Sequence, residues 1–137
     1  MKKYIISFGF IWIVIWCFVG LYHGALHESF AQRMLVLAQK GDLLNYWKTW
    51  ETWKQNAVIH SHGISFAFLN LFMGFIWTDI KFSEKIKNIL GIMAITGTIM
   101  AGVFGTLDML VPDAIGDVLL LVSFISCTAG YIKGINA

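Results

Sequence analysis

The chain has 137 residues, of which 58% are hydrophobic and 13% are charged, and its net charge is +2. Soluble domains carry about 25% charged residues, so this composition argues against a soluble enzyme and indicates a membrane protein. The positive charge is weak and scattered, which argues against a nucleic-acid partner. The length fits one domain, which we expect to comprise residues 1–137.

The first apolar run covers residues 4–22 and follows two lysines. A signal peptide also begins in this way. This run, however, is longer than the apolar region of most signal peptides, it carries Trp12 and Trp16, and no clear small-residue cleavage motif follows it. We therefore predict a retained transmembrane helix over about 4–26.

Residues 28–55 mix polar and aromatic side chains. Apolar residues recur at near-helical spacing up to Gly41, which is typical of a helix stop, and Asp42 is typical of a helix cap. The part that follows interleaves aromatic rings with charged side chains: Tyr46, Trp47, Trp50 and Trp53 among Lys48, Glu51 and Lys54. Such rings favour a membrane–water interface. We predict an amphipathic helical segment that lies flat on the membrane surface.

Three further apolar runs predict transmembrane helices over about 57–80, 89–110 and 114–132. We therefore expect an all-α membrane protein, a four-transmembrane-helix bundle with an amphipathic segment between the first and second spans. Pro112 and Asp113 form the expected connection between the last two spans, with Asp113 as a helix cap.

Small residues line one face of the third span. Gly97, Ala101 and Gly105 recur every four residues and permit close approach of another element. Tight helix packing on this face is favoured over a flat cofactor lying there, but both interpretations stay open.

The lysines predict the orientation. With four spans, six lysines share one side of the membrane: Lys2, Lys3, Lys81, Lys85, Lys87 and Lys133. The positive-inside rule then places both termini in the cytoplasm, in what we expect to be a bacterial inner membrane. The polar residues at the outer helix ends would be the four histidines with Glu28, Asp108, Asp113 and Asp117. Asn70 would lie about 12–15 Å deeper, near the bilayer centre.

All four histidines fall at two places in the chain. His23 and His27 are about 40° apart on a helix and share a face, whereas His60 and His62 are about 200° apart and point to opposite sides. Ionisable groups in a span are functional candidates, because their burial is costly. A solvated helix end is the alternative interpretation for the first pair.

The helix ends distinguish the two pairs chemically. A histidine near a helix N-terminus stays neutral and able to coordinate a metal, which favours His60 and His62 as metal ligands. His23 and His27 are better suited to pair with anionic groups, such as the propionates of a haem. A haem would also suit the glycine-lined face of the third span and Phe66 and Phe68. Copper, or another transition ion, and a purely structural subunit remain alternatives.

Some stretches of the sequence resemble styrene oxide isomerases, which are small four-span membrane enzymes. These are the segments IHSHGISFAFLN (59–70), Val19-Gly20-Leu21-Tyr22 and Ala101-Gly102-Val103-Phe104. The HxH pattern at a span start also resembles haem-bearing helices of haem–copper oxidases and nitric oxide reductases. The resemblance covers most of the chain as topology but only short pieces as sequence.

The resemblance implies a trimeric haem b protein that uses ferric iron as a Lewis acid to isomerise an epoxide. It implies His60 as the axial ligand and Asn70 as the active-site asparagine. The other residues expected to contact the cofactor are His62, His23, His27, Gly97, Ala101 and Phe104.

Two features depart from the isomerase pattern. Phe104 stands where the family has a tyrosine, and Asn70 is farther from the histidines than in the family. We therefore expect small-ligand binding but poor isomerase activity. A bis-histidine iron would instead mean an electron-transfer cytochrome. The expected partners are the lipid bilayer, a small-molecule ligand or substrate and further copies of the chain.

Overall fold

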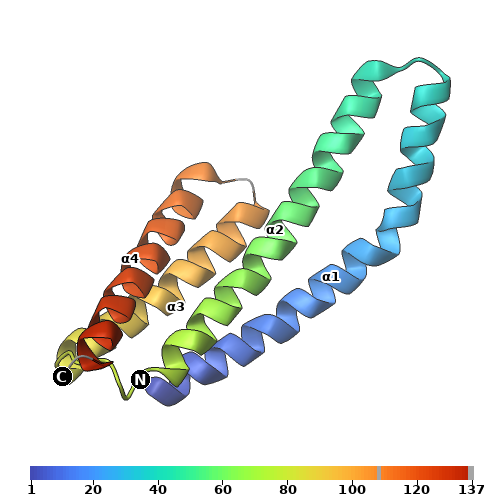
Figure 1. Cartoon of the computed structure of the whole chain (residues 1–137). Helices are drawn as coiled ribbons and strands as arrows, with labels where there is room; N and C mark the ends of the chain where they lie inside the picture. The colour runs from blue at the N-terminus through green and yellow to red at the C-terminus, as the bar shows by residue number, and fades with distance from the viewer. Residues whose placement is uncertain (108, 136–137) are drawn as a thin grey trace.

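The computed structural model describes residues 1–107 and 109–135, and these residues form an all-helical structure (Figure 1). Its four helices are α1 (Lys2–Gln39), α2 (Leu43–Phe75), α3 (Glu84–Thr106) and α4 (Leu110–Ile135). Each contains a stretch that is long and apolar enough to cross a membrane. The all-α class and the four candidate spans are therefore confirmed, and they are compatible with an integral membrane protein.

The helices form two hairpins that lie side by side. α1 packs chiefly against α2, and α3 chiefly against α4. At 1.5 Å per residue, α1 and α2 are about 57 and 50 Å long, whereas α3 and α4 are about 35 and 39 Å long. The second hairpin thus matches a hydrocarbon layer of about 30 Å. The first hairpin extends well beyond it, at the end opposite to the start of α1 and the end of α4 (Figure 1).

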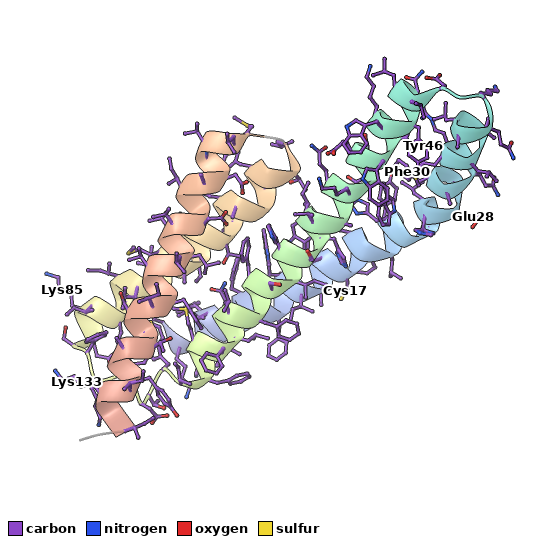
Figure 2. All side chains as sticks on the ribbon, turned by 45° about the horizontal axis from the view of Figure 1, so that its top comes forward. Cys17, Glu28, Phe30, Tyr46, Lys85 and Lys133 are labelled. Atoms are coloured by element: carbon purple, nitrogen blue, oxygen red, sulfur yellow. The ribbon has the colours of Figure 1, made fainter. Side chains whose placement is uncertain are left out.

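Charged side chains lie at both ends of the molecule. Lys85 and Lys133 lie at the end of the molecule where the chain begins, and Glu28 lies toward the far end of the long hairpin (Figure 2). Lys85 and Lys133, two of the six lysines that were expected on one side of the membrane, therefore lie at the same end of the molecule.

The segment 28–55 is not a separate helical segment as predicted. Its first part continues α1 and its second part begins α2, so the two arms form one long hairpin with a turn at Lys40–Asp42. Gly41 adopts a φ of 68° in this turn, and the Asp42 side chain accepts a hydrogen bond from the Asn45 backbone N–H. The stop and cap signals are therefore confirmed. The aromatic residues were interpreted as a surface belt, but Trp53 packs across the hairpin against α1.

The second span ends earlier than expected, at Phe75 instead of residue 80. The residues that follow are apolar because they pack beneath the bundle: Trp77 is 4% exposed and Ile80 is 2% exposed. The backbone N–H of Lys81 donates to the carbonyl of Gly130 at 3.1 Å and ties this connection to α4. Apolar content alone could not distinguish this buried connection after Phe75 from a longer helix.

The fourth helix begins at Leu110 instead of residue 114. Pro112 therefore lies in its first turn, where a missing N–H removes no helical hydrogen bond. Asp113 is also a first-turn residue and not the cap. The two residues that were expected to form the connection belong to the helix.

Two buried clusters hold the bundle together. The terminal core lies toward the chain ends and contains Ile5, Met73, Trp77, Ile80, Leu90, Ala94, Leu120 and Cys127. A smaller aromatic cluster contains Trp12, Trp16 and Ala67. Large apolar side chains of the spans, such as Phe18 and Leu121, point outward and are exposed. Such an arrangement is typical of helices that face lipid.

Candidate functional site

His60 lies between α2 and α1. A Cβ atom at Gly20 would lie 2.6 Å from Nε2 of His60, so this imidazole rests on the α1 backbone where no side chain is present. Its ring centroid is 6.4 Å from that of Trp16. The side chain is half-buried, and its Nδ1 is buried without a protein hydrogen-bond partner.

His62 occupies the opposite side of α2 and is exposed. Its ring lies 5.8 Å from that of Phe66, one turn along the helix. The expected divergence of the two histidines is therefore confirmed: His60 contacts α1, and His62 does not share that contact. One iron cannot be ligated by both from a single α2 helix.

His23 and His27 lie on the face of α1 that is turned toward α2, as their spacing predicts. His23 is half-buried and lines a small cavity of about 50 Å³ together with Trp53 and Asn56 of α2. His27 is exposed, and its ring centroid is 6.0 Å from that of Trp53. Both residues therefore belong to the long hairpin and not to a solvated helix end.

The histidine pairs do not form a metal-binding group. Within residues 1–107 and 109–135, no three or more His, Cys, Asp or Glu side chains are placed to hold one ion. Asp108, which was expected among the outer polar residues, lies outside the described residues.

The glycine-lined face of α3 is covered by α4. A Cβ atom at Gly97 would lie 2.7 Å from the carbonyl oxygen of Gly116, and Ala101 is 4% exposed. At Gly97 and Ala101 this face therefore serves tight helix packing, whereas Gly105 is half-buried at the end of α3. Phe104 is half-buried in the last turn of α3, where its carbonyl accepts a hydrogen bond from the Met109 N–H at 2.9 Å.

Asn70 is fully buried and links the two hairpins. Its Nδ2 donates to Thr98 Oγ1 of α3 at 2.6 Å and to the carbonyl of Phe66 at 2.8 Å. Its Oδ1 has no protein partner. Thr98 stands 11 residues beyond Lys87, the buried lysine near the start of α3, which is about 16 Å along the helix. If α3 spans a bilayer of about 30 Å, the pair lies close to its centre.

Sequence reasoning missed the polar roles of Thr98, Trp12 and Trp16. Both indole Nε1 atoms are buried without a protein partner. The Trp16 ring packs on Gly63, and the Trp12 ring packs on Gly102. The spacing of the two tryptophans, one turn apart in an apolar run, was the available signal. It could not reveal that both rings face glycines.

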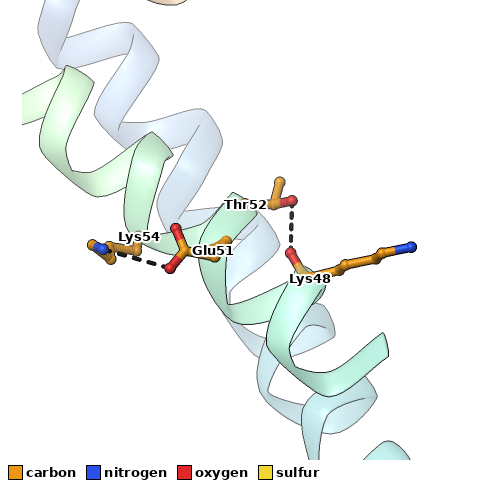
Figure 3. A network of polar contacts seen from close by, with 4 residues as sticks. All are labelled: Lys48, Glu51, Thr52 and Lys54. Atoms are coloured by element: carbon orange, nitrogen blue, oxygen red, sulfur yellow. Dashed lines mark hydrogen bonds and ion pairs between the residues drawn. The ribbon is translucent and has the colours of Figure 1, made fainter. Parts of the chain in front are cut away.

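A groove of about 400 Å³ lies between the long arm of α2 and the end of α3. One wall carries the Glu51–Lys54 ion pair, 3.6 Å apart, and nearby on α2 the Thr52 hydroxyl donates to the carbonyl of Lys48 (Figure 3). The described lining of the groove comprises Glu51, Lys54, Gln55, Asn56, Val58, Ile59, Gly105 and Thr106. The groove therefore has charged and amide side chains of α2 in one part of its lining, and His62 is not among its lining residues.

Comparisons of the chain with protein-family models, with curated proteins and with solved structures found no match.

Proposed function

We propose that this chain is an integral membrane protein that binds haem b through His62. The observation that supports the proposal is the exposure of this imidazole on a helix that is long and apolar enough to cross a membrane. His62 lies eight residues before Asn70, about 12 Å farther from the bundle centre. At that depth the ring lies near the edge of a hydrocarbon layer of about 30 Å, where an ionisable side chain on a candidate span is a functional candidate for a ligand or a partner. An axial bond to iron would provide one.

The surroundings of the two candidate ligands favour His62 over the His60 that the family resemblance implied. Nε2 of His60 faces Gly20, so coordination at that atom would require α1 to move. His62 has no such obstruction, and the neighbouring Phe66 ring could lie against a flat macrocycle. Haem would therefore lie on the outer face of α2. A second copy of the chain would cover its other face, in line with the expected oligomer.

Haem, when bound, supplies an iron that coordinates small ligands or acts as a Lewis acid. This chain would supply the imidazole that holds it. Asn70 has only its Oδ1 free, because Nδ2 is bonded to Thr98 and Phe66. Phe104 offers no hydroxyl group. We therefore propose that the bound haem binds small ligands and does not isomerise epoxides. The lysines at the chain ends favour an orientation with both termini in the cytoplasm.

The test is the absorption spectrum of the protein purified in detergent from haem-supplemented cells. The wild type should show a Soret band. His62→Gly should lose it, and free imidazole added during reconstitution should restore it. His27→Gly is the matched control, because His27 is also an exposed histidine but lies on α1.

Three outcomes would contradict the proposal. A wild-type protein without a Soret band would remove haem altogether, and bound copper in its place would support the metal-handling alternative. Loss of the band in His60→Ala with retention in His62→Gly would restore the ligand that the resemblance implied.

A further inference from the structure

Five buried polar atoms in the described chain have no protein hydrogen-bond partner, and they follow one line. They are Nδ1 of His23, Nδ1 of His60, Nε1 of Trp16, Nε1 of Trp12 and Oδ1 of Asn70. The first three belong to the α1–α2 seam, the contact surface between these two helices, and the Trp12 ring lies where the seam meets Gly102 of α3. Asn70 lies at its inner end, where α2 meets α3. The tryptophans and the asparagine are at least nine-tenths buried.

The residues of α2 that face this seam are regularly spaced along the helix. Asn56, His60, Gly63, Ala67 and Asn70 are separated by alternating steps of four and three residues, so they share one helix face. Each step advances about 5 Å. A water molecule that makes two hydrogen bonds of about 2.8 Å spans a similar distance. Each step along this face of α2 therefore has about the length that one bridging water spans.

The outer end of the seam has room for water. The cavity of about 50 Å³ there is lined by His23 and Asn56 as well as by apolar side chains. A bound water needs about 10–15 Å³ of such volume and two to four polar partners. Both conditions are met at the end of the seam near the His23 cavity.

The inner end of the seam is closed. Beyond Asn70, Met73 of α2 and Trp77 of the connection that follows α2 belong to the apolar terminal core. Met73 is 0% exposed and Trp77 is 4% exposed. A polar route that enters at the His23 cavity therefore ends at the Asn70–Thr98 hydrogen bond.

We propose that the α1–α2 seam binds a single file of water molecules that reaches from the His23 cavity to Asn70. The file brings water to the middle of the bundle from one side and does not cross it. Indole N–H groups only donate hydrogen bonds, whereas a neutral imidazole both donates and accepts. The tryptophans therefore orient the waters beside them, and Oδ1 of Asn70 accepts from the last one.

Two alanines provide a matched test in lipid bilayers. Ala67 lies on the seam, Ala94 lies in the terminal core, and both are 0% exposed. In water-edited solid-state NMR, magnetisation from water should reach the Ala67 methyl group and the indole N–H groups of Trp12 and Trp16. It should not reach the Ala94 methyl group. Single Trp→Phe variants assign the two indole signals.

The variant Asn56→Leu fills the outer cavity with an apolar side chain and should lower the water signal at Ala67 several-fold. Val58→Leu, two residues away on an exposed part of α2, should leave it unchanged. Equal and weak signals at Ala67 and Ala94 in the wild type would show a dry seam and overturn the proposal, whether or not Asn56→Leu folds. Equal and strong signals would show a route across the bundle and overturn its closure.

Discussion

The two hairpins use glycine for different purposes. Where α3 packs against α4, glycine admits backbone: a Cβ atom at Gly116 would lie 2.5 Å from the backbone nitrogen of Ala101. In the first hairpin glycine admits rings, because Gly20 seats the His60 imidazole and Gly63 seats the Trp16 indole. The second hairpin is thus packed by main chain, and the first is packed by large side chains that carry polar atoms.

The hydrogen bonds show the same contrast. In the second hairpin the buried Ser123 hydroxyl donates to the carbonyl of Leu90 at 2.7 Å, and this group is satisfied. In the first hairpin, imidazole and indole nitrogens are buried without a protein partner. An unsatisfied buried polar group lowers stability by about 1–3 kcal/mol, so these nitrogens are candidate partners for the waters proposed above. The candidate site residues of α1 and α2 therefore differ from the satisfied buried hydroxyl of the second hairpin.

The largest stability effect is expected for Gly116→Ala. Its new methyl group would meet the main chain of α3, which cannot rotate away as a side chain can. The two helices would have to separate, and overpacking of this kind lowers stability by about 1–3 kcal/mol. The measurement is the free energy of unfolding in detergent.

Two matched substitutions sharpen this prediction. Gly20→Ala meets only the His60 ring, which can turn, so it should destabilise less than Gly116→Ala. Gly24→Ala meets nothing within 4 Å and should be neutral or slightly stabilising, since alanine favours helix by about 0.5–1 kcal/mol. If Gly20→Ala is the most damaging of the three, the contrast between backbone and ring packing is wrong.

The sequence predicted the helices better than their ends. Apolar runs and the Gly41–Asp42 signals located four helices and one turn, because local chemistry determines these features. The prediction of a separate amphipathic segment over 28–55 was wrong. An interfacial helix and the arm of a long hairpin contain the same mixture of aromatic rings and lysines. Only the pairing of α1 with α2 distinguishes them, and pairing is a tertiary property.

The candidate site shows the same limit. Helical periodicity correctly separated His60 from His62, and it placed His23 with His27 on one face. It could not decide that Gly20 lies under His60, because this depends on the register between α1 and α2. The small-residue face of α3 was ambiguous for a similar reason, since the same pattern suits a cofactor and a neighbouring helix.

A smaller effect is expected where the hairpins meet. Thr98→Val removes the acceptor of the Asn70 Nδ2 hydrogen bond at nearly constant volume, while the bond to Phe66 remains. Interhelical hydrogen bonds between spans contribute about 0.6 kcal/mol on average and up to about 1.7 kcal/mol. We expect a loss of about 1 kcal/mol, because both side chains are fully buried.

Thr128→Val is the control for this substitution. The Thr128 hydroxyl bonds only within α4, to the carbonyl of Phe124 at 2.9 Å, so its removal should matter little. A double-mutant cycle of Thr98→Val with Asn70→Ala isolates the pair. A coupling energy near zero would mean that the hairpins are held together by apolar packing alone.

The smallest effect is expected at the turn of the long hairpin, and it depends on pH. Hydrogen bonds from the side chain and backbone of Asn45 hold the pKa of Asp42 below its ordinary value. A carboxylate with a lowered pKa in the folded state stabilises that state above its unfolded pKa of about 3.9, and this contribution disappears as the pH falls through the folded pKa. Asp42→Ala should therefore lower the melting temperature slightly at about pH 6 and leave it nearly unchanged below about pH 3. Asp42→Asn keeps a capping side chain without the titrating charge, so its melting temperature relative to Asp42→Ala should not vary over this range. A difference between wild type and Asp42→Ala that persists undiminished in acid would show that the carboxylate charge adds nothing to this cap.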